Sequence, residues 1–189
     1  MRILRAAENR AMPWKNGDGT TYEIAVFPEN STVADFDWRI SRALVSKPGP
    51  FSIFPGIDRS LSILSGKLAL ARGGDELIDL SPDSTPYSFP GEDRISGSPS
   101  GDLPVVDFNV MVRRDRCIAS VVRWKISEPV AVPEIAYFTV IFVEAGRVEI
   151  GDHLVDALDC IVFGKGDIDT VRSAGGAARL LAVTLKLRE

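Results

Sequence analysis

Residues 61–91 of this chain, LSILSGKLALARGGDELIDLSPDSTPYSFPG, form an ordered series of short apolar segments and turns. An apolar strand is followed by a turn at Gly66, a second strand, a glycine turn and a third strand that precedes a Phe-Pro-Gly corner. The same order recurs in residues 138–166, FTVIFVEAGRVEIGDHLVDALDCIVFGKG, with Gly146 at the first turn. A repeat of hairpin-rich segments indicates two β-barrels or jelly rolls, a form of closure that leaves few strand edges unpaired.

The rest of the chain has the character of an all-β protein. Its 16 Gly and 12 Pro residues are scattered and separate short runs rich in Val, Ile, Leu and Phe. No segment has a helical apolar stripe longer than about two turns. We expect one unit of residues 1–189 with two halves, roughly 1–110 and 111–189, between which strands can be exchanged. The predicted strands are 22–27, 36–44, 61–64, 67–71, 76–80, 106–113, 118–126, 137–143, 147–150, 160–163 and 179–187.

The composition excludes several classes of function. The chain has 189 residues, 45% of them apolar, and a formal net charge of -4. No apolar run approaches the roughly 20 residues that span a bilayer, and no signal peptide is evident, so we expect a cytoplasmic protein with no membrane partner. The cations are too dispersed for a nucleic-acid partner, and Arg113, Arg114 and Arg116 are expected in a solvated hairpin turn. Cys117 and Cys160 are expected to be buried, reduced thiols.

Four segments resemble conserved blocks of one known family. They are MPWKNGDGTTYEIA at 12–25, DFDWRIS at 35–41, GPFSIFPGIDR at 49–59 and DFNVM at 107–111, the last followed closely by arginines. In this order they are similar to the HutD/Ves family of the cupin superfamily. The motifs are long and specific over the first two thirds of the chain, whereas the last third matches only in pattern.

This resemblance implies a bicupin, an all-β chain with two cupin-like barrels. It also implies a small acidic metabolite as the ligand, for example an intermediate of histidine breakdown such as urocanate or N-formylglutamate. Members of the family are often associated with histidine-utilisation genes or with induction by environmental stress.

The histidine content argues against the metal chemistry of most enzymatic cupins. Those sites combine two or three His with a Glu, because first-row metals prefer imidazole nitrogen. This chain has one histidine, His153, which we expect to face solvent in a hairpin turn. We therefore expect no metal and no cofactor, and no Ser-His-Asp or Cys-His catalytic set unless His153 serves in it.

Polar residues alternate with apolar ones in two predicted strands. Arg39 and Ser41 alternate with apolar neighbours in one, and Asp107 and Asn109 do so in the other. If both strands line one barrel, these side chains converge inside it, and Arg39 is the first candidate to hold a carboxylate through two parallel hydrogen bonds. The alternative is that the polar faces of half-exposed sheets point to solvent.

Trp14, Lys15 and Asn16 form a second candidate group, with an aromatic plane, a cation and an amide just before a glycine turn. Such a segment can cap a barrel mouth over a flat acid, or Trp14 can simply plug the end of the barrel.

Two further segments have structural interpretations. Asp58 and Arg59 are expected to pair with each other in a turn, although a pair between Arg59 and Asp107 across strands is also open. Residues 97–101, GSPSG, are expected to form a flexible connecting loop, with a lid as the alternative.

These observations lead to one hypothesis and two rivals. The hypothesis is metal-independent binding of a small carboxylate in a sensing or regulatory role, with Arg39, Ser41, Asp107 and Asn109 inside a barrel and Trp14, Lys15 and Asn16 at its rim. The first rival is a metal-independent isomerase or hydrolase with Asp107 as general acid or base. The second is a structural or partner-binding protein with a filled barrel. A homodimer is the expected assembly, because symmetric dimers are the commonest oligomers.

Overall fold

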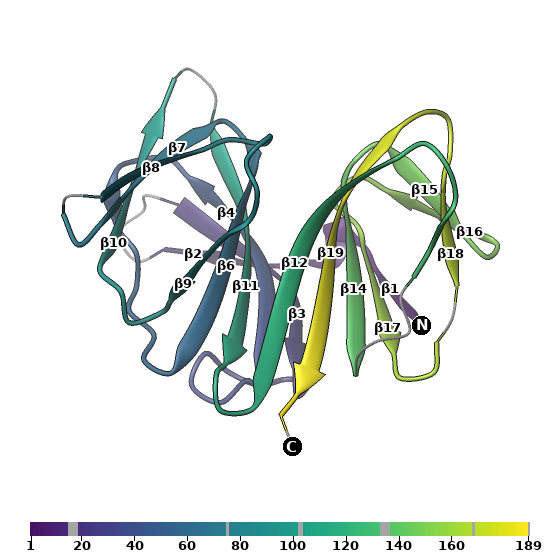
Figure 1. Cartoon of the computed structure of the whole chain (residues 1–189), viewed down its shortest axis with the longest axis horizontal. Coiled ribbons are helices and arrows are strands. Elements are labelled where there is room, and N and C mark those ends of the chain that lie inside the picture. Colours follow the sequence, from purple (N-terminus) through teal and green to yellow (C-terminus); the bar gives the residue numbers. More distant parts are fainter. Residues whose placement is uncertain (15–18, 75, 102–103, 133–136, 168, 189) are drawn as a thin grey trace. The chain divides into compact units, whose positions relative to one another are not determined.

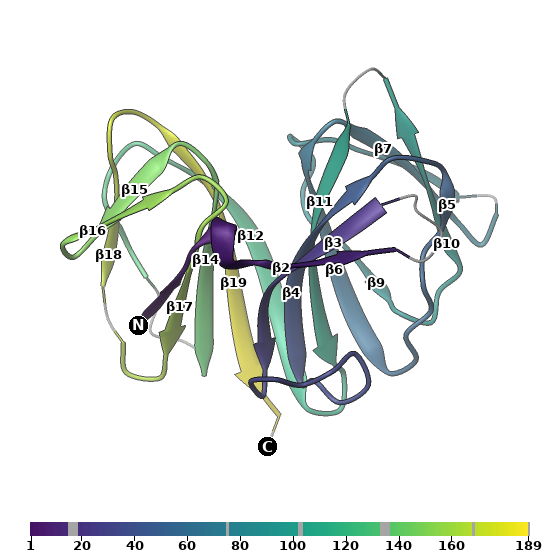
Figure 2. The same cartoon turned by 180° about the vertical axis from the view of Figure 1, so that it is seen from behind.

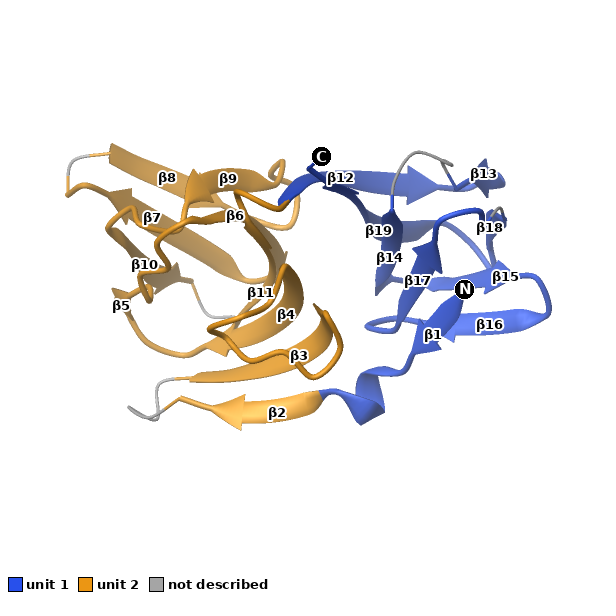
Figure 3. Cartoon of the chain, turned by 90° about the horizontal axis from the view of Figure 1, so that it is seen from below, with its two compact units in different colours: residues 1–9, 117–189 blue, residues 10–116 orange. Residues whose placement is uncertain are grey.

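The computed structural model describes residues 1–14, 19–74, 76–101, 104–132, 137–167 and 169–188. Within these ranges the only helix is a short 3-10 helix, η1 (Ala6–Glu8), and none is long and apolar enough to cross a membrane. The chain divides into two compact units, one of residues 10–116 and the other of residues 1–9 and 117–189 (Figure 3). We call them unit 2 and unit 1, respectively. The amino-terminal residues thus belong to the same unit as the carboxyl-terminal part of the chain.

Unit 2 consists of two antiparallel sheets. The larger has the strand order β2-β3-β4-β11-β6-β9 (Figure 1), and the smaller has the order β5-β10-β7-β8 (Figure 3). Seen from behind, β2 lies beside β3 at the edge of the larger sheet (Figure 2). Its strands are β2 (Arg10–Pro13), β3 (Gly19–Phe27), β4 (Trp38–Val45), β5 (Gly49–Pro50), β6 (Ile57–Ser65), β7 (Lys67–Arg72), β8 (Glu76–Leu80), β9 (Tyr87–Pro90), β10 (Ile95–Ser100) and β11 (Val105–Arg113).

Unit 1 repeats this arrangement. Its sheets have the orders β1-β17-β14-β19-β12 and β13-β18-β15-β16. Strand by strand, the pairings of β12 to β19 in unit 1 reproduce those of β4 to β11 in unit 2. Its strands are β1 (Arg2–Leu4), β12 (Cys117–Ile126), β13 (Val130–Ala131), β14 (Phe138–Ala145), β15 (Arg147–Ile150), β16 (His153–Asp156), β17 (Cys160–Gly164), β18 (Thr170–Ser173) and β19 (Ala178–Leu187).

The glycine turns that mark the repeat in the sequence have the same role in both units. Gly66 joins β6 to β7 with φ +75, and Gly146 joins β14 to β15 with φ +84. A left-handed backbone strains any residue that carries a Cβ, so glycine lets the chain reverse directly from one sheet into the other. The internal repeat predicted from the sequence is therefore confirmed by the strand pairing.

Each unit encloses its own apolar core between its two sheets. In unit 2, Leu61 and Ile63 from the larger sheet pack with Leu68 and Leu70 from the smaller one. In unit 1 the corresponding cluster is larger. It contains Ile126, Val132, Ile141, Val143, Val148, Ile150, Val155, Ile161, Phe163, Val171, Ala178, Leu180 and Ala182. Cys117 and Cys160 are both buried and free, as predicted.

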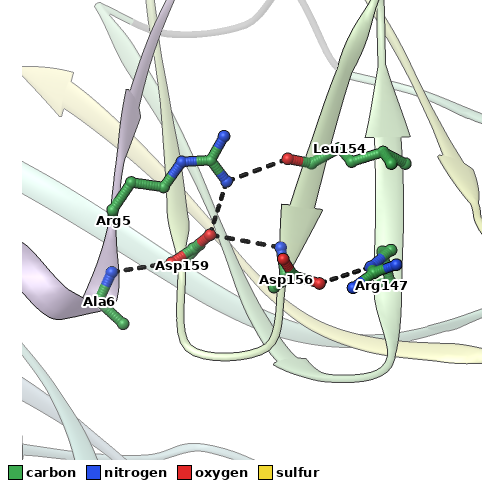
Figure 4. A network of polar contacts seen from close by, with 6 residues as sticks. All are labelled: Arg5, Ala6, Arg147, Leu154, Asp156 and Asp159. Atoms are coloured by element: carbon green, nitrogen blue, oxygen red, sulfur yellow. Dashed lines mark hydrogen bonds and ion pairs between the residues drawn. The ribbon is translucent and has the colours of Figure 1, made fainter.

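The amino terminus is fixed to unit 1 by β1 and by one buried carboxylate. Strand β1 pairs antiparallel with β17, and Asp159, just before β17, accepts hydrogen bonds from the Arg5 side chain at 2.7 Å and from the Ala6 amide at 2.8 Å (Figure 4). The Asp156 amide donates to the same carboxylate at 3.3 Å. One side chain thus accepts hydrogen bonds from both chain segments that form unit 1.

Some sequence-based interpretations of loops were wrong. Residues 95–100 form β10, which pairs with both β5 and β7, so the expected flexible loop at 97–101 is mostly a strand. The small side chains there have a steric purpose, because a Cβ on Gly97 would lie 2.8 Å from the Phe51 ring. His153 is exposed as expected, but it opens β16 and pairs with Ile150 next to the turn.

The arginine-rich turn at 114–116 also differs from its prediction. It joins β11 to β12, which belong to different sheets, so it is not a hairpin between paired strands. Arg114 forms ion pairs with Asp58 and Glu92, and Arg116 forms one with Asp37. These contacts hold neighbouring loops of unit 2 together.

Candidate functional site

The polar residues predicted on two strands lie on one face of the larger sheet of unit 2. Directly opposed residues of antiparallel strands share a face, and β11 is paired with β4 on one side and β6 on the other. The face is that of Leu61 and Ile63, which packs toward the smaller sheet. Its three successive rows are Arg39–Met111–Arg59, Ser41–Asn109–Leu61 and Ala43–Asp107–Ile63.

These polar side chains are buried rather than turned to solvent. Arg39, Ser41, Asp107 and Asn109 all belong to the buried residues of the unit. The opposite face of β4 and β11 is buried as well, as Ile40 and Val110 show. The alternation of polar and apolar residues therefore identified the two faces correctly, but both faces of these central strands are buried.

The site also contains Arg59, which sequence reasoning had assigned to a turn. Arg59 lies in β6 and is 8% exposed. Its guanidinium carbon lies 5.0 Å from the centroid of the Phe89 ring, 5.3 Å from that of Phe51 and 5.7 Å from that of Phe54. Three aromatic rings around one guanidinium form a cage that stabilises a positive charge through cation–π attraction.

The hydrogen bonds of Arg59 are few and long. Its Nε donates to Asn109 Oδ1 at 3.5 Å, and its Nη1 donates to the Ser52 carbonyl at 3.4 Å. Among the described residues no carboxylate forms an ion pair with Arg59. Burial lowers the pKa of Arg59 to about 10, with Asp107 opposing and Arg39 reinforcing this shift. The guanidinium is therefore a buried cation that lacks a close counter-ion.

The expected self-paired turn of Asp58 and Arg59 is wrong. Their side chains point to opposite faces of β6, and Asp58 pairs with Arg114 at 2.7 Å. The physical reason is that both residues lie inside a strand, where neighbouring side chains alternate between faces. Arg59, Leu61 and Ile63 occupy every second position of the strand and therefore share one face. This spacing was the signal in the sequence that placed Arg59 on the core face.

Arg39 differs from Arg59 in having a full ionic partner. Its Nε donates to Glu23 Oε2 at 2.7 Å, and the two side chains come from the adjacent strands β4 and β3. Glu23 was not singled out from the sequence, although it lies within the segment 12–25. The pair neutralises both charges within the site, so Arg39 is held in place by a protein carboxylate.

Asp107 is the second ionisable group of the site that has no ion-pair partner among the described residues. It is 4% exposed, and its Oδ1 atom is buried with no hydrogen-bond partner. Burial raises the pKa of Asp107 to about 7, against the attraction of Arg59 and a hydrogen bond from the Ala43 backbone. The alternative pairing of Arg59 with Asp107 across strands is not seen as an ion pair, although the two groups attract each other electrostatically.

Of the rim candidates, Trp14 lies against the apolar core of unit 2. Its Nε1 donates to Thr21 Oγ1 at 2.9 Å, and a Cβ on Gly19 would lie 2.9 Å from the Trp14 ring. The ring thus closes one end of the core beside β3. Lys15 and Asn16 lie outside the described residues, and their predicted role stays a prediction.

The repeat shows that this polar face is confined to one barrel. When the two repeats are aligned so that Gly66 matches Gly146, the strand pairing gives the residue of unit 1 that corresponds to each position of the site. The counterparts of Arg39, Ser41, Arg59, Asp107 and Asn109 are Ser120, Val122, Thr139, Leu180 and Ala182. None of these five counterparts is charged, so the charged face of unit 2 is replaced by uncharged residues at the corresponding positions of unit 1.

The donors that a first-row metal requires are not assembled. No three His, Cys, Asp or Glu side chains of the described residues gather into a possible metal site. His153 is exposed on β16 of unit 1, whereas the charged interior belongs to unit 2. The residues present therefore do not fit the nitrogen-rich metal centre common in cupins.

Two antiparallel barrels that repeat one strand order, with a charged interior in one of them, define this protein as a bicupin. The E. coli protein YhhW has this fold, with a TM-score of 0.70 and 11% identity over 97% of this chain and 96% of that chain. HutD from Pseudomonas fluorescens SBW25, in a structure described as a formate condition, has a TM-score of 0.85 and 26% identity, covering 100% of this chain and 99% of that chain.

The family follows from the sequence match. The HutD family model matches residues 6–181, and the chain belongs to the HutD family. Protein Ves from Citrobacter koseri is 33% identical over 151 residues, which cover 78% of this chain and 76% of that protein. The resemblance recognised in the sequence motifs is thereby confirmed.

Proposed function

We propose that this protein binds a small carboxylate metabolite in unit 2 without a metal, in a sensing or regulatory role. An intermediate of histidine degradation is the first candidate ligand. The observation that carries the proposal is the buried Arg59 guanidinium, which is caged by three aromatic rings and has no carboxylate partner in the part of the chain that the structure describes. A ligand carboxylate would supply the missing counter-ion and two charge-assisted hydrogen bonds.

The remaining polar residues have complementary roles in this proposal. Asn109 and Ser41 are opposed across β11 and β4, next to the row that contains Arg59, and offer neutral hydrogen-bonding groups. The pair of Arg39 and Glu23 adds a fixed dipole without net charge. Trp14, Lys15 and Asn16 are proposed to form the rim of the site.

The lack of this polar set in unit 1 supports a functional role. A buried charge without a partner destabilises a fold, and the counterparts in unit 1 show that the same architecture is built with uncharged residues. A purely structural barrel would gain nothing from the caged arginine. The filled-barrel alternative is therefore less well supported for unit 2 than for unit 1.

The test measures binding of formate, urocanate and N-formylglutamate by titration calorimetry and thermal shift. Arg59→Gln should abolish binding of any acid that the wild-type protein binds, whereas Arg59→Lys should weaken it at least tenfold because lysine lacks the planar fork. Arg147→Gln, which alters an exposed arginine of unit 1, is the matched control and should bind normally. Equal affinity in the wild-type and Arg59→Gln proteins would overturn the proposal.

A second candidate function is a metal-independent isomerase or hydrolase acting on such an acid. It is favoured by Asp107, because a buried carboxyl with a pKa of about 7 is suited to general acid–base catalysis near neutral pH. Turnover of a bound acid that is lost in Asp107→Asn, while binding persists, would establish the enzyme. Unchanged concentrations of every bound acid after prolonged incubation with the wild-type protein would exclude it for those acids.

A further inference from the structure

The interior of unit 2 contains two ionisable groups that the fold leaves uncompensated, and they have opposite sign. Within the described ranges, Arg59 is a cation without a carboxylate at ion-pair distance, and Asp107 is a carboxyl group with a buried oxygen that has no hydrogen-bond partner. Both side chains lie on the same face of adjacent strands. Buried polar atoms are almost always satisfied in native proteins, so an orphaned oxygen needs an explanation.

Apart from the Ala43 backbone, no described neighbour offers Asp107 a hydrogen bond or an opposite charge at ion-pair distance. On this face of the larger sheet the charged residues are Arg10, Glu23, Arg39, Arg59 and Arg113. Arg39 pairs with Glu23, Arg113 donates to the carbonyl oxygens of Phe36 and Ala34, and Arg10 is exposed on the edge strand β2. The smaller sheet turns Leu68, Leu70 and Ile95 toward this face, together with Arg72, which pairs with Asp93 and donates to the Tyr87 hydroxyl. The site therefore contains one positive group, Arg59, and one negative group, Asp107, that do not pair with each other and lie mainly among apolar side chains.

From this arrangement we infer that the ligand is a zwitterion, with a carboxylate for Arg59 and a protonated nitrogen, such as an ammonium, amidinium or imidazolium group, for Asp107. The inference rests on the proposed function, because the carboxylate end uses the Arg59 anchor. It narrows the ligand class from carboxylates in general to those that also carry a cationic nitrogen donor.

Charge complementarity distinguishes this ligand from a simple acid. An anion bound to Arg59 cancels the attraction that favours ionised Asp107, so binding of a simple acid is coupled to proton uptake by Asp107. A ligand that also carries a cation favours the ionised carboxylate, and its binding is coupled to proton release. The two ligand types must therefore have opposite pH dependence.

The experiment compares matched acids on the whole chain by titration calorimetry at pH 6 and pH 8. The probes are unbranched ω-amino acids from 3-aminopropanoate to 6-aminohexanoate, each paired with the fatty acid of equal carbon number. At the chain length that spans the site, the amino acid should bind more tightly than its partner. That preference should grow at least tenfold from pH 6 to pH 8. Titrations at pH 7 in buffers of different ionisation enthalpy should show proton release for the amino acid and uptake for the fatty acid.

Two variants identify Asp107 as the origin of the preference. Asp107→Leu places the side chain of its counterpart Leu180 at this position, and it should remove both the preference and its pH dependence. Asp107→Asn, which keeps the shape, should do the same if the leucine variant does not fold. Retention of the preference in a folded variant would overturn the inference.

The outcomes separate the two proposals. If fatty acids bind in an Arg59-dependent way but no amino acid binds more tightly than its partner, the zwitterion inference is overturned and carboxylate binding stands. If neither series binds at any chain length, carboxylate binding at Arg59 is overturned and the zwitterion inference with it.

Discussion

Arg59 and Asp107 lie on adjacent strands of one sheet with their side chains on the same face, yet no hydrogen bond or ion pair joins them. Arg59 instead donates long hydrogen bonds to Asn109 and to the Ser52 carbonyl, and aromatic rings surround its guanidinium. A fold selected for stability alone would bring two such groups together or replace them with apolar residues. Their separation is the feature on which the proposed function depends.

The pH dependence of stability should report the protonation of Asp107. An unperturbed Asp titrates near 3.8, whereas Asp107 in the folded protein has a pKa of about 7. Between these values the folded state binds more protons than the unfolded state, so the free energy of unfolding falls as pH rises from about 4 to about 7. Above pH 7 Asp107 adds no further change.

Asp107→Asn should lack this loss, which amounts to at most about 4 kcal/mol at roughly 1.4 kcal/mol per pKa unit. Urea unfolding of both proteins at pH 5 and pH 8 measures the difference. The contribution of other titrating groups cancels because both proteins share them. Parallel stability changes in wild type and variant would contradict a raised pKa of Asp107.

Removal of Arg59 should raise the pKa of Asp107 further. The Arg59 charge favours ionised Asp107, so Arg59→Gln leaves burial unopposed. Carboxyl carbon chemical shifts followed by NMR across pH 5 to 9 give the pKa directly. Arg39→Gln is the comparison, and it should change the Asp107 pKa less than Arg59→Gln does. A lower Asp107 pKa in Arg59→Gln would show that another group governs its titration.

Loss of the Asp159 carboxylate should loosen the amino terminus of unit 1. Asp159→Ala leaves the Ala6 and Asp156 amides without this acceptor and leaves the Arg5 side chain with the Leu154 carbonyl oxygen alone, so we expect a loss of about 2–3 kcal/mol in the free energy of unfolding. Hydrogen exchange of the β1 amides should accelerate as well. The control is Asp156→Ala, whose side-chain pair with Arg147 is 55% and 53% exposed and should contribute under about 1 kcal/mol.

Two glycine turns of unit 1 should differ in their tolerance of a side chain. Gly146 and Gly151 both have positive φ, but a Cβ on Gly146 would lie 3.1 Å from the Ala177 carbonyl oxygen, whereas a Cβ on Gly151 would meet nothing within 4 Å. Gly151→Ala should cost about 1–2 kcal/mol through backbone strain alone. Gly146→Ala should cost more, and thermal unfolding of the two variants tests the order.

The strand pattern was accessible from the sequence because local chemistry sets it. Residues 67–71, 76–80 and 147–150 were predicted within one residue of strands β7, β8 and β15. One strand that was missed, β10, contains Gly97 and Pro99, which are typical of turns rather than of strands. Its strand conformation comes from pairing with neighbours on both sides, which a local pattern does not contain.

The candidate site was accessible only in part, for the same reason. Alternation placed Arg39, Ser41, Asp107 and Asn109 on common faces, and the strand pairing put β4 beside β11. The alternation in the sequence did not reveal that Glu23 neutralises Arg39 or that Phe51, Phe54 and Phe89 enclose Arg59. Phe89 is distant from Arg59 in the chain, and Phe51 and Phe54, although near Arg59 in sequence, lie outside the strands whose alternation was considered.

The sequence by itself determined an all-β chain, its internal duplication and its membership of the HutD family, because periodicity, glycine turns and motif order are properties of neighbouring residues. Only the tertiary structure decided which barrel has a charged interior and which arginine lacks a partner. Charge compensation depends on distances between strands that meet after folding, and no spacing along the chain encodes those distances.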